Sequence, residues 1–361
     1  MQITLFSLLM SVIWSSVLAA FNYCCRKKKF FIRQLGMTNL LFLYLFSIVR
    51  MLVPYTFSFT RVIPSQGVIN DFYKSACMDK IGVTQFSLIS VLSVIWMGVS
   101  TALILKFLFQ YRKAVAEVSS CPICEDEQCR RVFHRVLNQS RTELRIAIRR
   151  SGNIHVPMGV GIFKKSILLP RQAYSDSELY YILRHEYTHF QNRDLMIKLF
   201  MHIYWCIFWW NPVIWFLKRD LSQILEIKCD LDVTERMKNQ DKAGYLTAIV
   251  KILKQTGAKR QEKAFCGSTA LVAGNYESEV IERFRIVSAV DGRKRKNALF
   301  TGTWFLIFGI LVFLSYSFVI QPECEISRSR IAAGQETPEA AAGNPYRIKC
   351  IDGMYHVYFH K

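Results

Sequence analysis

Four stretches of the chain are apolar and long enough to cross a membrane as helices. Each approaches the ~20 residues that an α-helix needs to span ~30 Å of hydrocarbon. Three of them lie within residues 1–110, at about 4–22, 35–53 and 86–109, and the fourth covers residues 298–320. No charged side chain precedes Arg26, and Lys27, Lys28 and Lys29 follow it directly. A cleaved secretory signal has its basic residues before the apolar stretch. This order therefore predicts a retained helix whose C-terminal end faces the cytoplasm.

Charge is distributed unevenly along a chain with these four crossings. The crossings place residues 111–297 inside, and the loop 54–85 and the tail 321–361 outside. The outer segments, with Arg50 at the outer end of the second span, hold nine basic and seven acidic residues, so +18 of the total charge of +20 lies inside or within the spans. This is the sign that membrane topology predicts. We therefore expect both termini outside, and an inner surface that meets anionic lipid and does not bind nucleic acid directly.

The inner segment combines helical patterns with a small sheet. The pattern is helical over residues 111–141, alternates over 143–148, and is typical of short strands over 154–169. The next helix has clear start signals, because Ser175 is a candidate cap and Glu178 follows three residues later. With 52% apolar residues, the chain is not a disordered protein. The fold class that we predict is an α+β membrane protein with four transmembrane helices and a mainly helical inner domain.

A His-Glu-x-x-His sequence lies on the helix that begins near Ser175. His185 and His189 are four residues apart, so they share one face of the helix and can present two imidazole nitrogens to one metal ion. Glu186 lies beside them and can accept a proton. The alternative is that the two histidines only form hydrogen bonds on the helix surface.

A third candidate ligand follows 37 residues after His189. Catalytic zinc commonly has three protein ligands and an open position for water, and two histidines with one glutamate are a known set. Glu226 can supply the carboxylate, and Asp230, one helical turn later, can accept a hydrogen bond from a ligating histidine. Asp194 is a candidate for orienting the helix of the motif. The alternatives are a solvated carboxylate for Glu226 and a simple salt bridge for Asp194.

The segment between the two halves of this site is apolar enough to span a bilayer. It covers residues 195–217 and contains five tryptophans or tyrosines between 204 and 215. A single crossing would leave His189 and Glu226 on opposite faces of the membrane, where they cannot share an ion. We therefore predict a dip into the membrane surface, or a hairpin that turns near Asn211 with Lys198 and His202 wet or paired. A buried helical pair in a soluble core is the alternative.

Together these motifs resemble the integral-membrane zinc peptidases of the BlaR and MecR type, the antirepressor sensor-transducers of bacterial resistance operons. The resemblance covers about residues 1–320. It rests on His-Glu-Tyr-Thr-His at 185–189 with Asp194, Asn-Pro-Val-Ile-Trp at 211–215, Glu-Ile-Lys-Cys-Asp at 226–230, and Gly-Ile-Phe-Lys-Lys-Ser-Ile-Leu-Leu-Pro at 161–170. The resemblance implies a multi-pass protein of the bacterial cell membrane, with a gluzincin-like zinc peptidase domain at 111–297 and the active site on the cytoplasmic side.

The resemblance also implies a chemistry and a signalling role. His185, His189 and Glu226 would hold one catalytic Zn²⁺ ion, and Glu186 would be the general base of peptide hydrolysis. The substrate would be a cytoplasmic protein such as a transcriptional repressor. Self-cleavage would fall within residues 277–290, for which a solvated linker is the alternative. The resemblance does not identify the extracytoplasmic ligand or partner, and it leaves open whether the chain forms a homodimer.

The residues alone are also compatible with two other functions, and they leave the roles of two further segments undecided. A housekeeping membrane protease of the prenyl-peptidase or heat-shock type also has His-Glu-x-x-His beside its spans, and a non-enzymatic receptor would use zinc only for structure. The strand pattern at 162–169 fits either an edge that receives a substrate peptide or a core strand. A structural zinc site, or else free thiols, is compatible with the spacing of Cys121, Cys124, Cys129 and His134.

The tail departs from the best-known members of that family. Those carry a large outer penicillin-binding domain whose nucleophile lies in Ser-x-x-Lys, and residues 321–361 contain no such pattern. We therefore expect this chain to lack that sensor domain and not to sense β-lactams covalently. The tail predicts a hairpin of residues 346–351 and 354–360 around Asp352-Gly353. A bridge between Cys324 and Cys350 would stabilise it.

Overall fold

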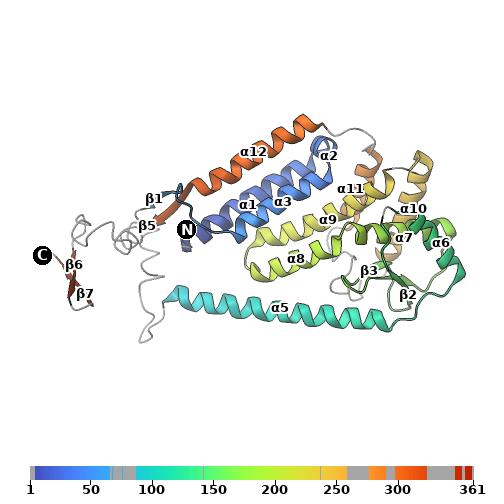
Figure 1. Cartoon of the computed structure of the whole chain (residues 1–361), viewed down its shortest axis with the longest axis horizontal. Helices are drawn as coiled ribbons and strands as arrows, with labels where there is room; N and C mark the ends of the chain where they lie inside the picture. The colour runs from blue at the N-terminus through green and yellow to red at the C-terminus, as the bar shows by residue number, and fades with distance from the viewer. Residues whose placement is uncertain are drawn as a thin grey trace. The chain divides into compact units, whose positions relative to one another are not determined.

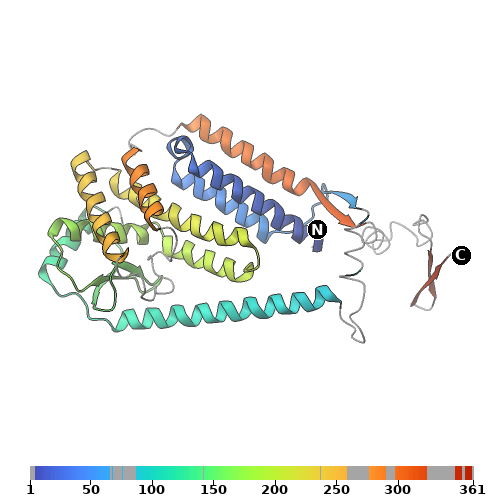
Figure 2. The ribbon, with the colours of Figure 1, turned by 180° about the vertical axis from the view of Figure 1, so that it is seen from behind.

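The computed structural model is mainly helical, with short strands between the helices (Figures 1 and 2). It describes residues 5–65, 67, 75, 87–140, 142–235, 237–257, 276–289, 297–322, 346–351 and 354–359. The chain divides into two compact units. Unit 1 comprises Met1–Ser15, Phe46–Trp96 and Leu306–Lys361, and unit 2 comprises Ser16–Leu45 and Met97–Phe305.

Three helices in the described part of the chain are long and apolar enough to cross a membrane, namely α1 (Leu5–Lys27), α5 (Leu88–Ser120) and α12 (Ala298–Ser317). The second predicted span forms a shorter apolar helix, α3 (Met37–Leu52). Its 16 residues reach ~24 Å at 1.5 Å per residue. Helix α3 begins at Met37 and not at the predicted residue 35, because Gly36, with φ +75°, separates it from the short helix α2 (Lys29–Leu35).

The helices differ from the predicted spans at their ends. α5 continues for 33 residues, because the helical pattern that follows residue 109 extends the same helix. α12 ends at Ser317, and the next residues form strand β5 (Phe318–Pro322). The residues Phe318, Val319 and Ile320 have the aromatic and β-branched side chains that favour a strand.

Unit 1 contains a small parallel sheet that the sequence did not indicate. Strand β1 (Arg61–Ser65) pairs with β5, with Arg61 opposite Phe318. Sequence analysis predicted only a loop at 54–85, because five residues that include Pro64 give a weak strand pattern. Next to this sheet, Arg50 is buried and donates hydrogen bonds to the Ser315 hydroxyl and carbonyl oxygens at 2.8 and 2.9 Å.

The predicted tail hairpin is present as strands β6 (Tyr346–Ile351) and β7 (Met354–Phe359), which pair antiparallel. Asp352 and Gly353, on which the predicted turn type depends, lie outside the described residues. Cys324 also lies outside them, so the bridge to Cys350 stays a prediction.

Unit 2 is built around a three-stranded sheet of order β2-β4-β3. Its strands are β2 (Ala147–Ser151), β3 (Met158–Val160) and β4 (Ser166–Pro170). Every residue of β4 is buried, because β4 is the central strand. Ile167 and Leu169 pack in the core formed with helices α6 (Glu127–Asn138) and α7 (Asp176–Gln191), and Leu168 faces the end of α5 on the other side.

Two strand predictions therefore need correction. The alternating residues 143–148 only begin a strand, since β2 covers Ala147–Ser151. The edge that was considered at 162–169 is not an edge, because β4 pairs with β2 on one side and with β3 on the other. The edge strands are β2 and β3, and β3 contacts α7.

The segment between the two halves of the motif forms a helical hairpin. Helices α8 (Asp194–Ile207) and α9 (Pro212–Thr234) contact each other and lie side by side in Figures 1 and 2. The turn falls where the sequence predicted it, because the Asn211 side chain caps α9 and accepts a hydrogen bond from the Val213 N–H at 2.9 Å. Helices α10 (Asn239–Gly257) and α11 (Tyr276–Ala289) complete the unit against α7 and α9.

Candidate metal centre

Helix α7 holds the two histidines of the motif on its buried face. The helix begins with the predicted capping box, in which the Ser175 hydroxyl accepts from the Glu178 N–H and the Glu178 carboxylate accepts from the Ser175 N–H. His185 and His189 are only 6% and 1% exposed. Their Nε2 atoms lie 3.2 Å apart, so both imidazoles point toward the same space, as the spacing of four residues requires.

Glu226 of α9 faces the same space from the opposite side. Its Oε2 lies 3.6 Å from Nε2 of His185, and its Oε1 lies 3.6 Å from Nε2 of His189. Donor atoms at ~2 Å from one tetrahedral ion are ~3.3 Å from one another. The three predicted ligand residues thus come together at separations that fit a single zinc ion.

The distal nitrogens of both histidines have hydrogen-bond partners, a carboxylate for His189 and a tyrosine hydroxyl for His185. Nδ1 of His189 lies 2.7 Å from Oδ2 of Asp194. Nδ1 of His185 lies 2.8 Å from the Tyr245 hydroxyl, which donates to Oδ1 of Asp230 at 2.6 Å. Because Tyr245 donates to Asp230, its oxygen accepts the Nδ1–H of His185. Both Nε2 lone pairs are then left for a metal ion.

These contacts refine two predictions made from the sequence. Asp194 orients His189 directly, in addition to lying in the first turn of α8. Asp230 lies 3.4 Å from Nδ1 of His185, and it is linked to that ring by the two shorter hydrogen bonds of Tyr245 of α10. Nothing in the sequence indicated Tyr245, because its helix is remote from the motif along the chain.

A partly buried lysine and a buried arginine neutralise the acidic residues of the centre. Lys198 of α8 lies 3.1 Å from Oε1 of Glu226, and Arg283 of α11 lies 3.3 Å from Oε2. Arg283 also binds both oxygens of Asp230, at 2.7 and 2.8 Å. Burial by itself would raise the pKa of Glu226, but Lys198 and the neighbouring histidines hold it well below its usual value. Glu226 is therefore a carboxylate, which is the form that binds metal.

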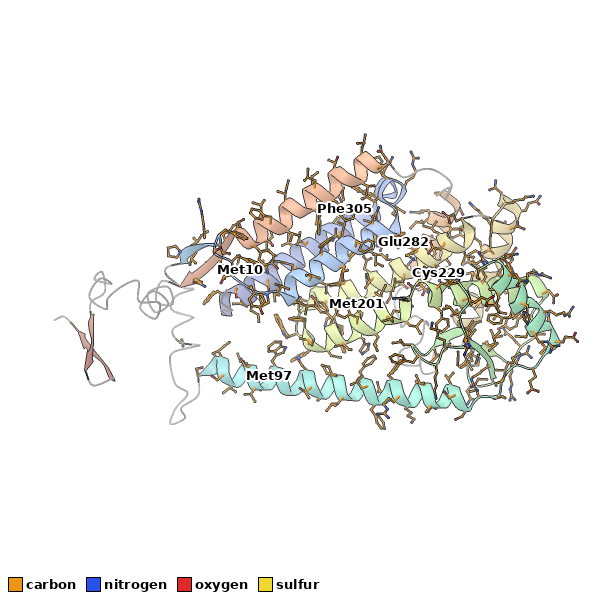
Figure 3. All side chains as sticks on the ribbon, viewed as in Figure 1. Met10, Met97, Met201, Cys229, Glu282 and Phe305 are labelled. Carbon is orange, nitrogen blue, oxygen red and sulfur yellow. The ribbon has the colours of Figure 1, made fainter. Side chains whose placement is uncertain are left out.

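Cys229 of α9 is a further potential donor that the sequence did not single out. His185, His189 and Cys229 form a group whose donor atoms lie within 4.8 Å of one another. The sulfur lies 3.6 Å from Nδ1 of His185, and the thiol donates to the His185 carbonyl oxygen at 3.4 Å. Burial raises the pKa of the thiol to about 12. Cys229, labelled in Figure 3, is therefore a neutral thiol beside the two imidazoles.

Glu186 lies at the junction of α7 and strand β3. It is 6% exposed, and a Cβ atom at Gly159 of β3 would lie 3.4 Å from its Oε2 and 2.9 Å from the ring of Phe190. A side chain at position 159 would thus crowd this carboxylate. The absence of a side chain there lets the edge strand pass close to the motif.

The second candidate metal site is not assembled. In the described part of the chain, the potential ligands that lie close enough to hold an ion gather around His185 and His189, and Cys121, Cys124, Cys129 and His134 form no such group. Cys124 and Cys129 pack against each other in the core beside α6, and burial raises the pKa of Cys129 to about 12. These cysteines are free thiols, which was the alternative considered from the sequence.

A helix with His-Glu-x-x-His that faces a glutamate of a second helix is the donor arrangement of a zinc-dependent metallopeptidase. Comparison with known proteins agrees. The profile of the family described as BlaR1 peptidase M56 matches residues 28–287, a range that includes every candidate site residue. The chain belongs to this family of membrane metallopeptidases.

Individual relatives include a regulatory protein and a methicillin resistance protein. The regulatory protein BlaR1 of Bacillus licheniformis is 27% identical over 206 residues, which cover 56% of this chain and 33% of the relative. The methicillin resistance mecR1 protein of Staphylococcus aureus is 28% identical over 155 residues, or 42% of this chain and 26% of the relative. The chain therefore matches about a third or less of the length of these relatives.

Proposed function

We propose that this chain is a zinc-dependent membrane endopeptidase that passes on a signal by cleaving a cytoplasmic protein, as an antirepressor. The observation that carries the proposal is the convergence of the two Nε2 atoms and the Glu226 carboxylate at separations of 3.2 to 3.6 Å. The family and the regulatory relatives support the signalling part. A transcriptional repressor is the substrate that such relatives suggest.

His185, His189 and Glu226 would hold the zinc ion. When bound, zinc would polarise the scissile carbonyl and acidify a water molecule. The chain prepares the ligands for this role, since Asp194 and the Tyr245–Asp230 pair keep each Nδ1 protonated and each Nε2 free. Lys198 and Arg283 balance the charge of the buried carboxylates.

Glu186 would act as the general base. It follows His185 directly on α7, and its buried carboxylate can take a proton from the attacking water and deliver it to the leaving amine nitrogen. Strand β3 would position the substrate, because it is an edge strand and passes beside Glu186 at Gly159. An extended peptide that pairs with β3 would bring its backbone to the motif, as gluzincin-like peptidases require.

We further propose four membrane crossings with the metal centre on the cytoplasmic side. α1 and α5 each begin in unit 1 and end in unit 2. If both helices cross in the same direction, the chain must return between them. α3 is the apolar helix in the described residues between them, and it begins in unit 2 and ends in unit 1. The basic residues after α1 support a cytoplasmic position of its C-terminal end.

Zinc stoichiometry in the purified full chain tests the ligand set. We expect one zinc ion in the wild type and a loss of tightly bound zinc in Glu226→Ala. Glu235→Ala is the matched control, because Glu235 is an exposed glutamate at the end of the same helix. Equal zinc content in all three proteins would refute the assignment of Glu226.

Activity is tested with Glu186→Gln, which should keep zinc and lose hydrolysis by ~10²-fold or more. Two substrates are compared: casein, and any small winged-helix repressor whose gene is found beside this one. Cleavage of the repressor alone supports the antirepressor role. Equal cleavage of casein indicates a housekeeping protease. Retained signalling in Glu186→Gln would instead indicate a non-enzymatic receptor.

Self-cleavage within residues 277–290 would need a change of structure. This segment lies almost entirely in helix α11, and Arg283 in its middle is bound to Asp230. A protease binds an extended chain, so α11 would have to unwind before it is cut. Gel analysis of the wild type beside Glu186→Ala decides this point, because a fragment found in both proteins cannot come from self-cleavage.

A further inference from the structure

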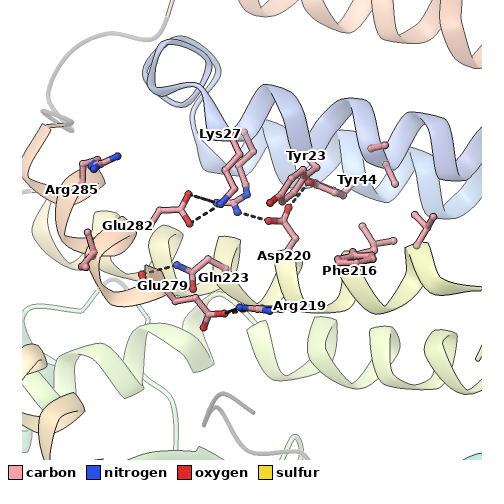
Figure 4. Close-up of a pocket in the computed structure, with 16 residues that line it drawn as sticks. Tyr23, Lys27, Tyr44, Phe216, Arg219, Asp220, Gln223, Glu279, Glu282 and Arg285 are labelled. Carbon is pink, nitrogen blue, oxygen red and sulfur yellow. Dashed lines mark hydrogen bonds and ion pairs between the residues drawn. The ribbon is translucent and has the colours of Figure 1, made fainter. Parts of the chain in front are cut away.

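A cavity of about 740 Å³ lies between α1, α3, α9 and α11 of unit 2, and none of the candidate metal ligands lines it (Figure 4). Its lining changes in character along the helices. Apolar residues come from the earlier turns, with Ala20 on α1 and Phe216 on α9. Charged residues come from the later turns, with Lys27 on α1 and Arg219 on α9. Figure 4 shows Phe216 and Arg285 at opposite sides of this space.

The charges around the cavity do not balance. Four basic and three acidic side chains line it. The three acidic groups are all paired: Asp220 with Arg26, Glu279 with Arg219 at 2.9 Å, and Glu282 with Arg26 and Lys27 at 3.0 and 3.3 Å. In the part of the chain that the structure describes, no carboxylate pairs with Arg285, the fourth basic residue. The lining thus keeps one positive charge in excess.

The excess charge lies on the rim near Lys27. Arg285 is exposed and lies one helical turn after Glu282 on α11, so both face the cavity. Lys27 is 44% exposed and shares Glu282 with Arg26. Because Arg26 is buried and also bound to Asp220, Glu282 keeps a partner when Lys27 turns to another anion. Arg285 and Lys27 can therefore both serve a ligand at this rim.

The two ends of the cavity are separated by the depth of a lipid headgroup region. From Ala20 to Lys27 the helix α1 rises ~10 Å at 1.5 Å per residue. The headgroup layer on each side of a bilayer is ~5–8 Å thick. Because α1 is a candidate membrane span that ends at Lys27, its apolar turns lie at acyl-chain depth and its charged end at headgroup depth.

We propose that this cavity binds one anionic phospholipid. A phosphodiester carries one negative charge, which matches the single excess positive charge at Arg285. Its phosphate binds Arg285 and Lys27 at the rim, and one acyl chain follows the apolar wall at Ala20 and Phe216. A zwitterionic lipid brings an additional cationic group to a rim that is already positive, so it binds more weakly.

Native mass spectrometry of the full chain in a neutral detergent tests the proposal, with phosphatidylglycerol, phosphatidylcholine and inorganic phosphate added separately. We expect one tightly bound phosphatidylglycerol and roughly tenfold weaker binding of phosphatidylcholine, because the quaternary ammonium group of phosphatidylcholine is repelled by the positively charged rim. Weak or absent binding of inorganic phosphate shows that the acyl chain is needed. Phosphate that competes as well as the lipid would overturn the proposal of a lipid site.

Two variants with matched controls locate the site. Arg285→Gln should weaken phosphatidylglycerol binding about tenfold, whereas Arg130→Gln, an exposed arginine on α6, should not. Ala20→Trp should fill the apolar end and block the lipid, whereas Val17→Trp, exposed on the same helix, should not. If Ala20→Trp does not fold, Arg285→Gln still decides, because Arg285 is on the surface. Unchanged lipid binding in Arg285→Gln would refute the site.

Discussion

Glu282 and Arg283 are neighbours on α11, but they bind different parts of unit 2. The Glu282 carboxylate accepts a hydrogen bond from Arg26 of α1 at 3.0 Å. The Arg283 guanidinium binds Asp230 and Glu226 at the candidate metal centre. Consecutive residues on a helix point in directions ~100° apart, so one helix can hold both contacts. A movement of α11 relative to α1 would therefore alter the charges around Glu226.

Removal of the Arg283 charge should destabilise unit 2. In Arg283→Met, Asp230 and Glu226 keep their buried negative charges and lose a shared cation, which costs ~3–5 kcal/mol when one partner of a buried ion pair is lost. Thermal unfolding in detergent measures the effect. Arg285→Met is the control, because Arg285 is exposed on the same helix. Equal stability of the two variants would show that Arg283 has no such role.

Substitution of Asp194 should weaken metal binding and leave the ligands in place. Asp194→Asn removes the charge that holds Nδ1 of His189 at 2.7 Å. Loss of such a partner typically lowers metal affinity 10–100-fold, by ~1.4–2.7 kcal/mol. A chelator competition at fixed pH measures this affinity. Asp241→Asn, an exposed aspartate on α10, should match the wild type, and a normal affinity in Asp194→Asn would contradict the orienting role.

The contribution of Glu178 to the free energy of unfolding should depend on pH. Its bonds to Lys251 and to the Ser175 N–H lower its pKa below the usual 4.5, so its contribution is present above that value and disappears as the pH falls through the lower pKa of the folded state. Glu178→Gln should cost about 0.2–1 kcal/mol at pH 7, because glutamine keeps the capping bond and loses only the charge that pairs with the exposed Lys251. Thermal unfolding at pH 7 and near pH 3 should show this difference shrinking in acid. A difference that is constant with pH would exclude a charge effect.

Gly161 should not tolerate a side chain. Its φ of +90° is unfavourable for other residues, and a Cβ atom would lie 2.1 Å from the Lys164 carbonyl oxygen. Gly161→Ala should therefore destabilise the β3–β4 connection by at least ~1–3 kcal/mol. Gly152→Ala, where the nearest atom is 3.7 Å away, should have little effect. Resistance to limited proteolysis compares the two variants, and equal resistance would argue against strain at Gly161.

Much of the candidate site could be predicted because it depends on local order along the chain. The spacing of His185 and His189 places both rings on one helix face, and Asn211 with Pro212 marks a helix start. Strand β1 and the position of β3 at an edge of its sheet could not be predicted in this way. Short strands take their partners from remote residues, and a run of three to five residues gives little periodicity.

The sequence by itself determined the apolar helices, the capped helix α7 and the pair of histidines, because side-chain periodicity and capping act over a few residues. It also indicated Glu226 and Asp230 as partners, through their spacing of one turn. Only the tertiary structure decided how these groups are neutralised and oriented. Lys198, Tyr245 and Arg283 come from three other helices, and long-range packing, which no local pattern records, brings them to the same buried space.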